Sequence, residues 1–369
     1  MEKVNYCLRE GEPFDIGRSI GEKLCKNELK MTSFFDNLEM AIDSDSLTKT
    51  MDLFTKYCPH VLEEINGFSN VLEIESRKNF YLSYSFISPS CSQLAIKNST
   101  NYPDSSVLVR NYDFDLSTED FVIVNYKSKD NYHFIGTSML TFGVDSGVNE
   151  HGLAVSMSAC GPPVGIFQKA KVSGLRFWVV IRLLLETCKT VGQAKELLSE
   201  LPLGDNVSYV CIDSTDNMLL YQTVNGVRDY SIVENSSENY SIHVTNHPTF
   251  PKTVCEFPYA AQNSLIRYHL LENYLKVSGR KSLSDLKKIF TTLFPRGLYC
   301  NYYDEFFGTT KTVVLYPKER KLEICWCGLE KNGWKTYELN DSKEEETYVA
   351  TYEKGIAPED MFNMIRLKE

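Results

Sequence analysis

Four short segments of the sequence carry side chains that could together perform nucleophilic chemistry. Cys91 follows the irregular run 87–90 and starts the first of a series of predicted short strands. The other three segments, in chain order, are Arg110-Asn111-Tyr112-Asp113, Gly147-Val148-Asn149-Glu150-His151-Gly152-Leu153 and Val244-Thr245-Asn246-His247-Pro248. Taken singly, each has an ordinary explanation: a buried thiol, a surface ion pair, or an asparagine that serves a turn. Together they supply a nucleophile, a cation, a carboxylate and two amide donors.

The thiol of Cys91 needs a base before it can act as a nucleophile. A free cysteine has a pKa near 8.5, and none of the six histidines lies in a recognisable partner motif. A cysteine at the start of a chain carries its own base, because an α-amino group titrates at roughly 7.7–8.0. That amine can take the thiol proton and later return it to a departing amine. In such a site Asp113 would orient the amine, and Arg110 would favour the thiolate by its opposite charge.

The tetrahedral intermediate of an acyl transfer requires hydrogen-bond donors without negative charge. Asn149 and Asn246 are the candidate donors, and Asn246 is the better of the two because the turn around Asn149 offers a structural explanation. The same sulfur could also cut the chain. Cys91 would attack the carbonyl of Ser90, and water would resolve the thioester.

The order Cys, Arg-x-x-Asp, Asn-Glu-x-Gly-Leu, Thr-Asn resembles the choloylglycine hydrolase and penicillin acyltransferase group of N-terminal-nucleophile (Ntn) hydrolases, which act on linear amide C–N bonds. The resemblance covers most of the chain, since the run 57–67 is similar to the pro-segment signature of the group and the run 264–268 to a later segment. It implies an α+β fold, a four-layer αββα sandwich of two antiparallel sheets with an N-terminal helical pro-segment. It also implies latency until the chain cuts itself before Cys91.

This resemblance divides the chain into a pro-segment, residues 1–90, and a catalytic domain, residues 91–369. It adds Arg267 to the site, either to bind a substrate carboxylate or to brace the site beside Asp113. Ser90 stands where the acyltransferase branch often has glycine, so slow or conditional processing is expected. The sequence has no phosphate-binding loop, no dinucleotide fingerprint and no set of metal ligands at recognisable spacing, and we therefore expect no cofactor and no metal.

Hydrophobic periodicity predicts the elements that must position these residues. Apolar residues at helical spacing predict helices within 14–24 and 34–54 and after Pro59. Alternating runs predict short strands at 94–96, 107–109, 121–126, 133–137 and 153–157, with 145–152 as a turn. Two helices (175–187 and 190–201), strands over 207–244, two more helices (262–275 and 283–294) and a hairpin over 312–327 follow. That order suits stacked sheets with helices outside.

Composition limits the classes of partner. A net charge of −10 argues against nucleic acid and against an anionic membrane surface. The most apolar stretch, 177–185, is shorter than the roughly 20 residues that a membrane span needs. The start carries no apolar signal and the eleven cysteines are irregularly spaced, which predicts a reducing, cytoplasmic location. The expected partner is a small-molecule amide or acyl substrate, and a homo-oligomer is left open.

Two other functions remain open at this level. The first is a catalytically silent or unprocessed binding protein on the same fold, which would have no reason to keep Cys91, Arg110, Asp113 and Asn246 together. The second is a papain-like or caspase-like protease, whose local cysteine signatures are absent. The sequence decides neither the substrate nor whether water or an amine accepts the acyl group.

Overall fold

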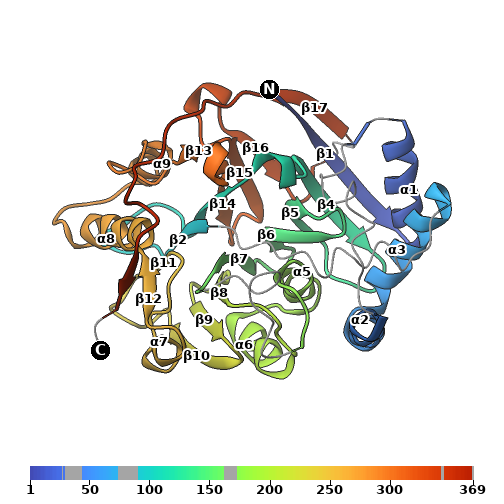
Figure 1. Cartoon of the computed structure of the whole chain (residues 1–369), viewed down its shortest axis with the longest axis horizontal. Helices are drawn as coiled ribbons and strands as arrows, with labels where there is room; N and C mark the ends of the chain where they lie inside the picture. The colour runs from blue at the N-terminus through green and yellow to red at the C-terminus, as the bar shows by residue number, and fades with distance from the viewer. Residues whose placement is uncertain (27, 30–43, 74–89, 162–172, 342–344, 368–369) are drawn as a thin grey trace.

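Two β-sheets stacked face to face form the centre of the molecule, with helices on both outer sides (Figure 1). The computed structural model describes residues 1–26, 28–29, 44–73, 90–161, 173–341 and 345–367. Parts of the helix predicted over 34–54 and of the irregular run 87–90 therefore lie outside the described residues.

The larger sheet has nine strands in the order β10-β9-β8-β7-β6-β5-β4-β1-β17. Adjacent strands of this sheet run antiparallel, except for β1 and β4, which run parallel. The bounds are β1 (Glu2–Gly11), β4 (Val122–Ser128), β5 (Phe134–Met139), β6 (Gly143–Asn149), β7 (Ala154–Ala159), β8 (Val207–Ile212), β9 (Met218–Val224), β10 (Val227–Val233) and β17 (Glu345–Ala350).

The smaller sheet has seven strands, in the order β11-β2-β3-β14-β15-β16 with β13 paired to β14. Its strands are β2 (Ser90–Ile96), β3 (Val107–Phe114), β11 (Ser241–Val244), β13 (Asn301–Tyr302), β14 (Phe307–Tyr316), β15 (Lys321–Trp326) and β16 (Lys335–Glu338). A separate two-stranded sheet pairs β12 (Tyr259–Ala261) with β18 (Met364–Arg366).

Three apolar layers hold the sandwich together. The inter-sheet layer includes Leu108 and Val313 of the smaller sheet and Val148 and Val210 of the larger one. Helices α1 (Pro13–Cys25), α3 (Pro59–Leu72), α5 (Phe177–Thr187) and α6 (Val191–Glu200) pack on the outer face of the larger sheet. Helices α8 (Gln262–Lys276) and α9 (Leu283–Thr291) cover the smaller sheet (Figure 1). The four-layer αββα prediction is confirmed; α2 (Ser44–Tyr57) packs on α3, and α7 (Pro251–Glu256) lies against β10.

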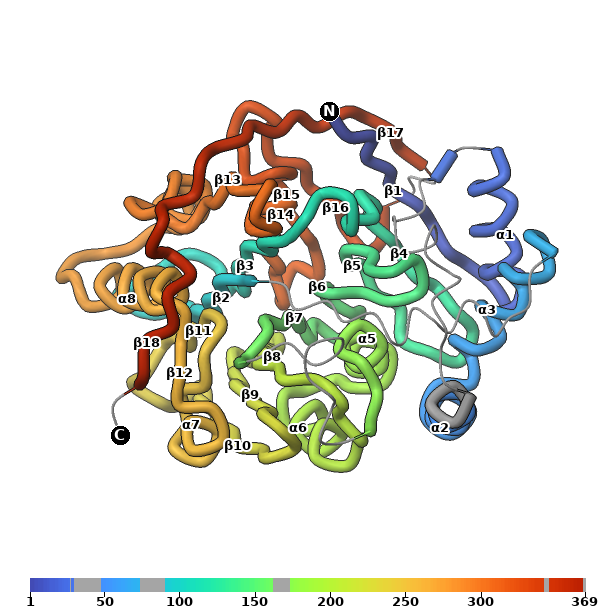
Figure 2. Tube along the Cα trace, viewed as in Figure 1, coloured from blue at the N-terminus to red at the C-terminus, as the bar shows by residue number. Residues whose placement is uncertain are grey.

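The N-terminal segment contains a strand in addition to the predicted helices. Residues Glu2–Gly11 form a strand inside the larger sheet, between β4 and β17 (Figure 2). Residues 4–7 are buried on both faces, so the strand lacks the alternation that reveals a half-buried strand in a sequence. The parallel pairing of β1 with β4 also makes this sheet mixed, where two purely antiparallel sheets were expected.

Residues 145–149, which were predicted to be part of a turn over 145–152, instead belong to strand β6. A Cβ at Gly143 would come within 2.4 Å of the Trp178 ring, and one at Gly147 within 2.7 Å of Leu185 Cδ1. Both of these partners lie on α5. The glycines therefore let this helix approach the sheet closely, and they do not make a turn.

Helices α1 and α3 cross so closely that their backbones touch at glycines. A Cβ at Gly67 would lie 2.0 Å from the carbonyl oxygen of Phe14, and one at Gly17 would lie 1.8 Å from that of Glu64. We expect Gly67→Ala to lower the free energy of unfolding by about 2–3 kcal/mol, because the helices must separate to admit the methyl group. Denaturant unfolding measures this. The control is Gly192→Ala in α6, where a Cβ meets nothing closer than 3.7 Å; equal losses in both variants would contradict the prediction.

Candidate active site around Cys91

The pairing of β2 with β3 brings three of the predicted residues to one place. Cys91 is opposite Tyr112, Ser90 is opposite Asp113, and Gln93 is opposite Arg110. Because side chains alternate along a strand, Cys91 and Arg110 face the larger sheet, while Asp113 faces the layer of α8. The thiol and the carboxylate thus flank the backbone of Cys91 from opposite sides.

The sulfur of Cys91 is buried against a guanidinium group. Arg110 Nη2 lies 3.3 Å from Cys91 Sγ, and neither residue is more than 1% exposed. Burial raises the pKa of the Cys91 thiol to about 11, and the positive charge of Arg110 partly opposes that rise. In the intact chain the thiol is therefore protonated at neutral pH.

Asp113 is a buried carboxylate with one oxygen still available. Thr309 Oγ1 donates to Oδ1 at 2.6 Å, whereas Oδ2 has no hydrogen-bond partner among the described residues, with Arg267 Nη1 at 3.7 Å. Burial raises the pKa of Asp113 to about 6, against the lowering effects of Arg267 and the Thr309 hydrogen bond. A buried, half-satisfied carboxylate favours the arrival of a positively charged donor.

Arg267 of α8 braces this group from the helical side. Its Nη1 donates to the carbonyl oxygen of Cys91 at 2.7 Å, and its Nη2 donates to Asn246 Oδ1 and Asn263 Oδ1, both at 2.7 Å. Of the two roles expected from the sequence, this geometry favours bracing over binding a substrate carboxylate.

Asn246 follows β11 and contacts the backbone of the nucleophile. Its Oδ1 accepts from the backbone N–H of Cys91 at 3.1 Å, and its Nδ2 donates to the carbonyl oxygen of Ala159 at 3.2 Å. The backbone N–H of Asn246 donates to Ser264 Oγ at 2.9 Å, which fixes the loop to α8. An amide NH₂ has two hydrogens, so Nδ2 has the capacity to donate to two acceptors.

The side chain of Asn149 bonds backbone groups at the end of α5 and in the turn after β6, and its expected role as a second oxyanion donor stays a prediction. Its Nδ2 donates to the carbonyl oxygens of Leu185 and Cys188 at the end of α5, at 2.8 and 2.7 Å. Its Oδ1 accepts from the backbone N–H groups of His151 and Leu153. The side chain therefore joins a turn to a helix end whose carbonyls would otherwise lack donors.

Sequence reasoning missed the charged residues behind Arg110, namely Asp145, Lys311 and Glu119. All three are buried, and Asp145 Oδ1 lies 3.2 Å from Arg110 Nη1. They are single charged residues on separate elements with no characteristic spacing, so the sequence carries no signal that joins them. Fully buried charges are rare enough that each requires a partner.

The raised pKa of Asp113 makes a testable prediction for the uncut chain. The folded chain binds this proton with a pKa of about 6 and the unfolded chain with one near 3.9. The free energy of unfolding should therefore fall as pH rises from about 4 to about 6, by about 3 kcal/mol from this group.

Urea unfolding of Cys91→Ala and of Cys91→Ala/Asp113→Asn, from pH 4 to pH 7, measures this contribution. We expect the double variant to gain stability relative to the single one as pH rises. His243 and His247, whose pKa values burial lowers to about 4, are common to both proteins and cancel in the difference. Parallel stability curves would contradict the prediction.

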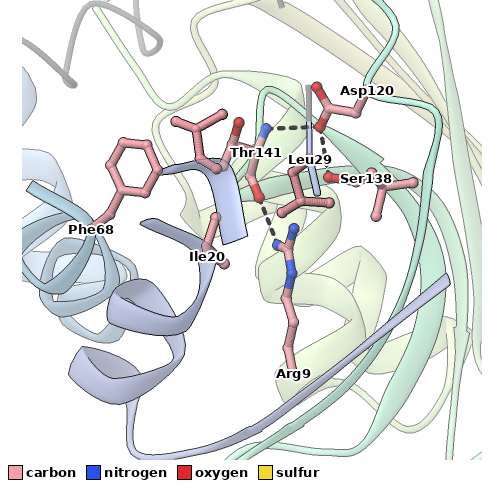
Figure 3. Close-up of a pocket in the computed structure, with 9 residues that line it drawn as sticks. Arg9, Ile20, Leu29, Phe68, Asp120, Ser138 and Thr141 are labelled. Atoms are coloured by element: carbon pink, nitrogen blue, oxygen red, sulfur yellow. Dashed lines mark hydrogen bonds between the residues drawn. The ribbon is translucent and has the colours of Figure 1, made fainter. Parts of the chain in front are cut away.

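A separate cavity lies between helices α1 and α3 and the larger sheet (Figure 3). Asp120 Oδ2 accepts there from Ser138 Oγ at 2.6 Å and from the Thr141 N–H at 2.8 Å, and Arg9 Nη1 donates to the Thr141 carbonyl at 2.6 Å. Its volume of about 20 Å³ holds one water-sized molecule. It is therefore too small to be a substrate site.

Within the described ranges, no three His, Cys, Asp or Glu side chains are grouped so that they could hold a metal ion. Cys325 and Cys327 are buried, and Cys325 Sγ lies 3.2 Å from the Leu329 carbonyl oxygen. In the same ranges, no helix combines the length and apolar character needed to cross a membrane.

The model of the acyl-coenzyme A:6-aminopenicillanic acid acyl-transferase family matches residues 100–330, which is more than half of the chain. The chain belongs to this family. The part of this chain that matches the acyltransferase family begins nine residues after Cys91. It includes Arg110, Asp113, Asn246 and Arg267. Membership confirms the resemblance to the penicillin acyltransferase group that was seen in the sequence.

Several solved structures are similar to this member of the acyltransferase family. A Caenorhabditis elegans ortholog of N-acylethanolamine-hydrolyzing acid amidase has 15% identity and a TM-score of 0.44, over 62% of this chain and 93% of that one. A mutant of conjugated bile acid hydrolase from Clostridium perfringens has 12% identity and a TM-score of 0.43, over 73% and 99%. Penicillin V acylase from Agrobacterium tumefaciens has 13% identity and a TM-score of 0.35, over 65% and 75%. No curated protein sequence matches the chain significantly.

Proposed function

We propose that this family member is a cysteine Ntn amidohydrolase or acyltransferase that acts on a linear amide through a thioester on Cys91. The observation that carries the proposal is that Cys91 lies between a buried cation on one side of its strand and a buried carboxylate on the other. The sulfur lies 3.3 Å from the buried Arg110 guanidinium. On the other side of the strand, opposite Ser90, Asp113 presents a buried oxygen without a hydrogen-bond donor among the described residues.

Activation requires that the peptide bond between Ser90 and Cys91 break. Cys91 Sγ attacks the carbonyl carbon of Ser90, the C–N bond breaks, and the nitrogen gains a proton to become the α-amino group of Cys91. Water then cleaves the thioester, leaving a carboxyl group on Ser90 and a free thiol on Cys91. The new ammonium would have donors for Asp113 Oδ2 and for Asn246 Oδ1, which already accepts from the same nitrogen.

Catalysis then uses the same groups in the cut enzyme. The α-amino group takes the thiol proton, and Arg110 stabilises the thiolate that attacks the substrate carbonyl. Asn246 Nδ2 is the proposed donor to the oxyanion, and Arg267 holds this side chain in place. The amine leaves with the proton from the α-amino group, and water or another amine then takes the acyl group from sulfur.

Intact mass and N-terminal sequencing of the purified protein test the activation step. The expected result is two chains, the larger beginning at Cys91. The cut protein is then incubated with penicillin V, a conjugated bile acid and an N-acylethanolamine, which are the substrate types named by the similar structures. Release of amine in proportion to the cut fraction supports the proposal. A cut enzyme whose Cys91 is never acylated by any amide or acyl thioester would overturn it.

A further inference from the structure

A line of buried charges of alternating sign extends from the sulfur into the space between the sheets. Arg110 contacts Cys91 at one end, and Asp145 of β6 pairs with Arg110. Lys311 of β14 lies 2.8 Å from Asp145 Oδ2 and bonds both oxygens of Glu119, at 2.7 and 2.8 Å. The side chains of Asp145, Lys311 and Glu119 are fully buried. Each inner charge lies between two opposite charges, which offsets the cost of burying it.

From this arrangement we propose that Asp145 is a positioning residue, which holds the Arg110 guanidinium against Cys91 Sγ, and that Lys311 holds Asp145 in place. The inference rests on the proposed role of Cys91 as nucleophile. It assigns to Asp145 no contact with substrate.

The contacts of Arg110 show how its direction is set. Nη1 donates to two acceptors on consecutive residues of β6, Ser146 Oγ at 2.8 Å and the Asp145 carbonyl oxygen at 3.2 Å, and it lies 3.2 Å from Asp145 Oδ1 as an ion pair. A guanidinium is planar and rigid, so fixing Nη1 fixes the direction of Nη2. Nη2 is thereby directed between Cys91 Sγ and Met157 Sδ, at 3.3 and 3.2 Å.

The two oxygens of Asp145 have different cations, which makes an amide a poor replacement. Oδ1 pairs with Arg110 and also accepts from Thr137 Oγ1, and Oδ2 pairs with Lys311. An asparagine has an oxygen at one end only, so Asp145→Asn must turn its NH₂ group toward one of the two cations. Either choice loosens the line that ends at the sulfur.

Asp145 could act on Cys91 through its own negative charge or by holding Arg110 in position, and these two roles predict opposite shifts of the Cys91 pKa in Asp145→Asn. If Asp145 acted only through its negative charge, its removal would lower the pKa of the Cys91 thiol, because that charge disfavours the thiolate. If Asp145 positions Arg110, its removal raises that pKa, because the nearer cation moves away. The Arg110 effect should dominate, since its charge is in direct contact with the sulfur.

The test is the pH dependence of alkylation of Cys91 by iodoacetamide in the purified, cut protein, followed by mass spectrometry of the peptide that begins at Cys91. This probe needs no substrate, and the midpoint of the pH dependence, unlike the absolute rate, does not depend on how easily the reagent reaches the sulfur. For Asp145→Asn we expect the midpoint to rise by about one pH unit and alkylation at pH 7 to slow about tenfold. Arg110→Met should raise the midpoint of alkylation by at least as much.

Asp120→Asn is the matched control. Asp120 is the residue after Glu119, and its buried carboxylate accepts hydrogen bonds from Ser138 and Thr141, not from the line of charges behind Cys91. It should leave the midpoint unchanged. Thr137→Val removes a donor to Asp145 without changing charge, and it should shift the midpoint upward by a smaller amount. That variant decides the question if Asp145→Asn does not fold.

The outcomes separate the inference from the proposed function. A downward shift, or none, in Asp145→Asn with an upward shift in Arg110→Met overturns the positioning role and leaves the proposed function intact. No shift in Arg110→Met overturns the role of Arg110 itself. If Asp145→Asn is unfolded, an unchanged midpoint in Thr137→Val overturns the inference.

Discussion

Replacement of Cys91 by alanine is expected to leave one uncut chain without measurable turnover. Both the cut and the catalysis would use the same sulfur, and in the intact chain the nitrogen of Cys91 is an amide that donates to Asn246 and cannot act as a base. Intact mass reports the cut, and amine release reports turnover. Cys91→Ser should cut slowly, since a hydroxyl is the poorer nucleophile at neutral pH.

The matched control for this variant is Cys211→Ala, which removes a buried thiol from β8. It should be cut and active after any loss of stability is taken into account. In the cut wild-type protein the two fragments should remain together through high salt and separate only in denaturant, because β1 is hydrogen-bonded between β4 and β17 of the larger fragment. Full activity from a chain shown by mass to be uncut would reject Cys91 as an N-terminal nucleophile.

Replacement of Asn246 by alanine should lower kcat by about 10²–10³ while the protein remains folded. The substitution removes the proposed oxyanion donor and the oxygen that accepts from Cys91 N and from Arg267. Because the oxyanion exists only in the transition state and intermediate, the loss should fall on kcat more than on KM. Steady-state kinetics of the cut variant, with thermal unfolding as the check on folding, measures this.

Asn149→Ala provides the contrast. The side-chain amide of Asn149 forms hydrogen bonds with four backbone groups near the end of α5. Its removal is therefore expected to lower the free energy of unfolding by about 2–4 kcal/mol. Turnover per folded molecule should change little. The opposite pattern, with Asn149→Ala impairing kcat and Asn246→Ala only stability, would return the oxyanion role to Asn149.

Local patterns in the sequence were sufficient for most elements with clear periodicity. The helices over 175–187 and 262–275 appear as α5 and α8, and the helix over 190–201 appears as α6, where Thr190 accepts from the Gln193 N–H as the N-cap. Helix α5 is strongly apolar and α6 is amphipathic, so the sequence pattern of these two helices follows from the surface that each buries. Strand β1 was missed because it is buried on both faces, and β6 because its glycines serve close packing against α5.

The candidate catalytic group was proposed from residue types in a fixed order, and the family model matches residues 100–330, which include most of that group. Which of these residues contact one another was decided by the tertiary structure. Arg110 and Asp113 are three residues apart on one strand, so their side chains lie on opposite faces and flank Cys91 from two sides. Asn149 was assigned to the end of α5, and Asp145 and Lys311 were joined to Arg110, by contacts between distant segments. A sequence records periodicity and order along the chain, whereas the partner of a buried charge depends on which strands face each other across the sandwich.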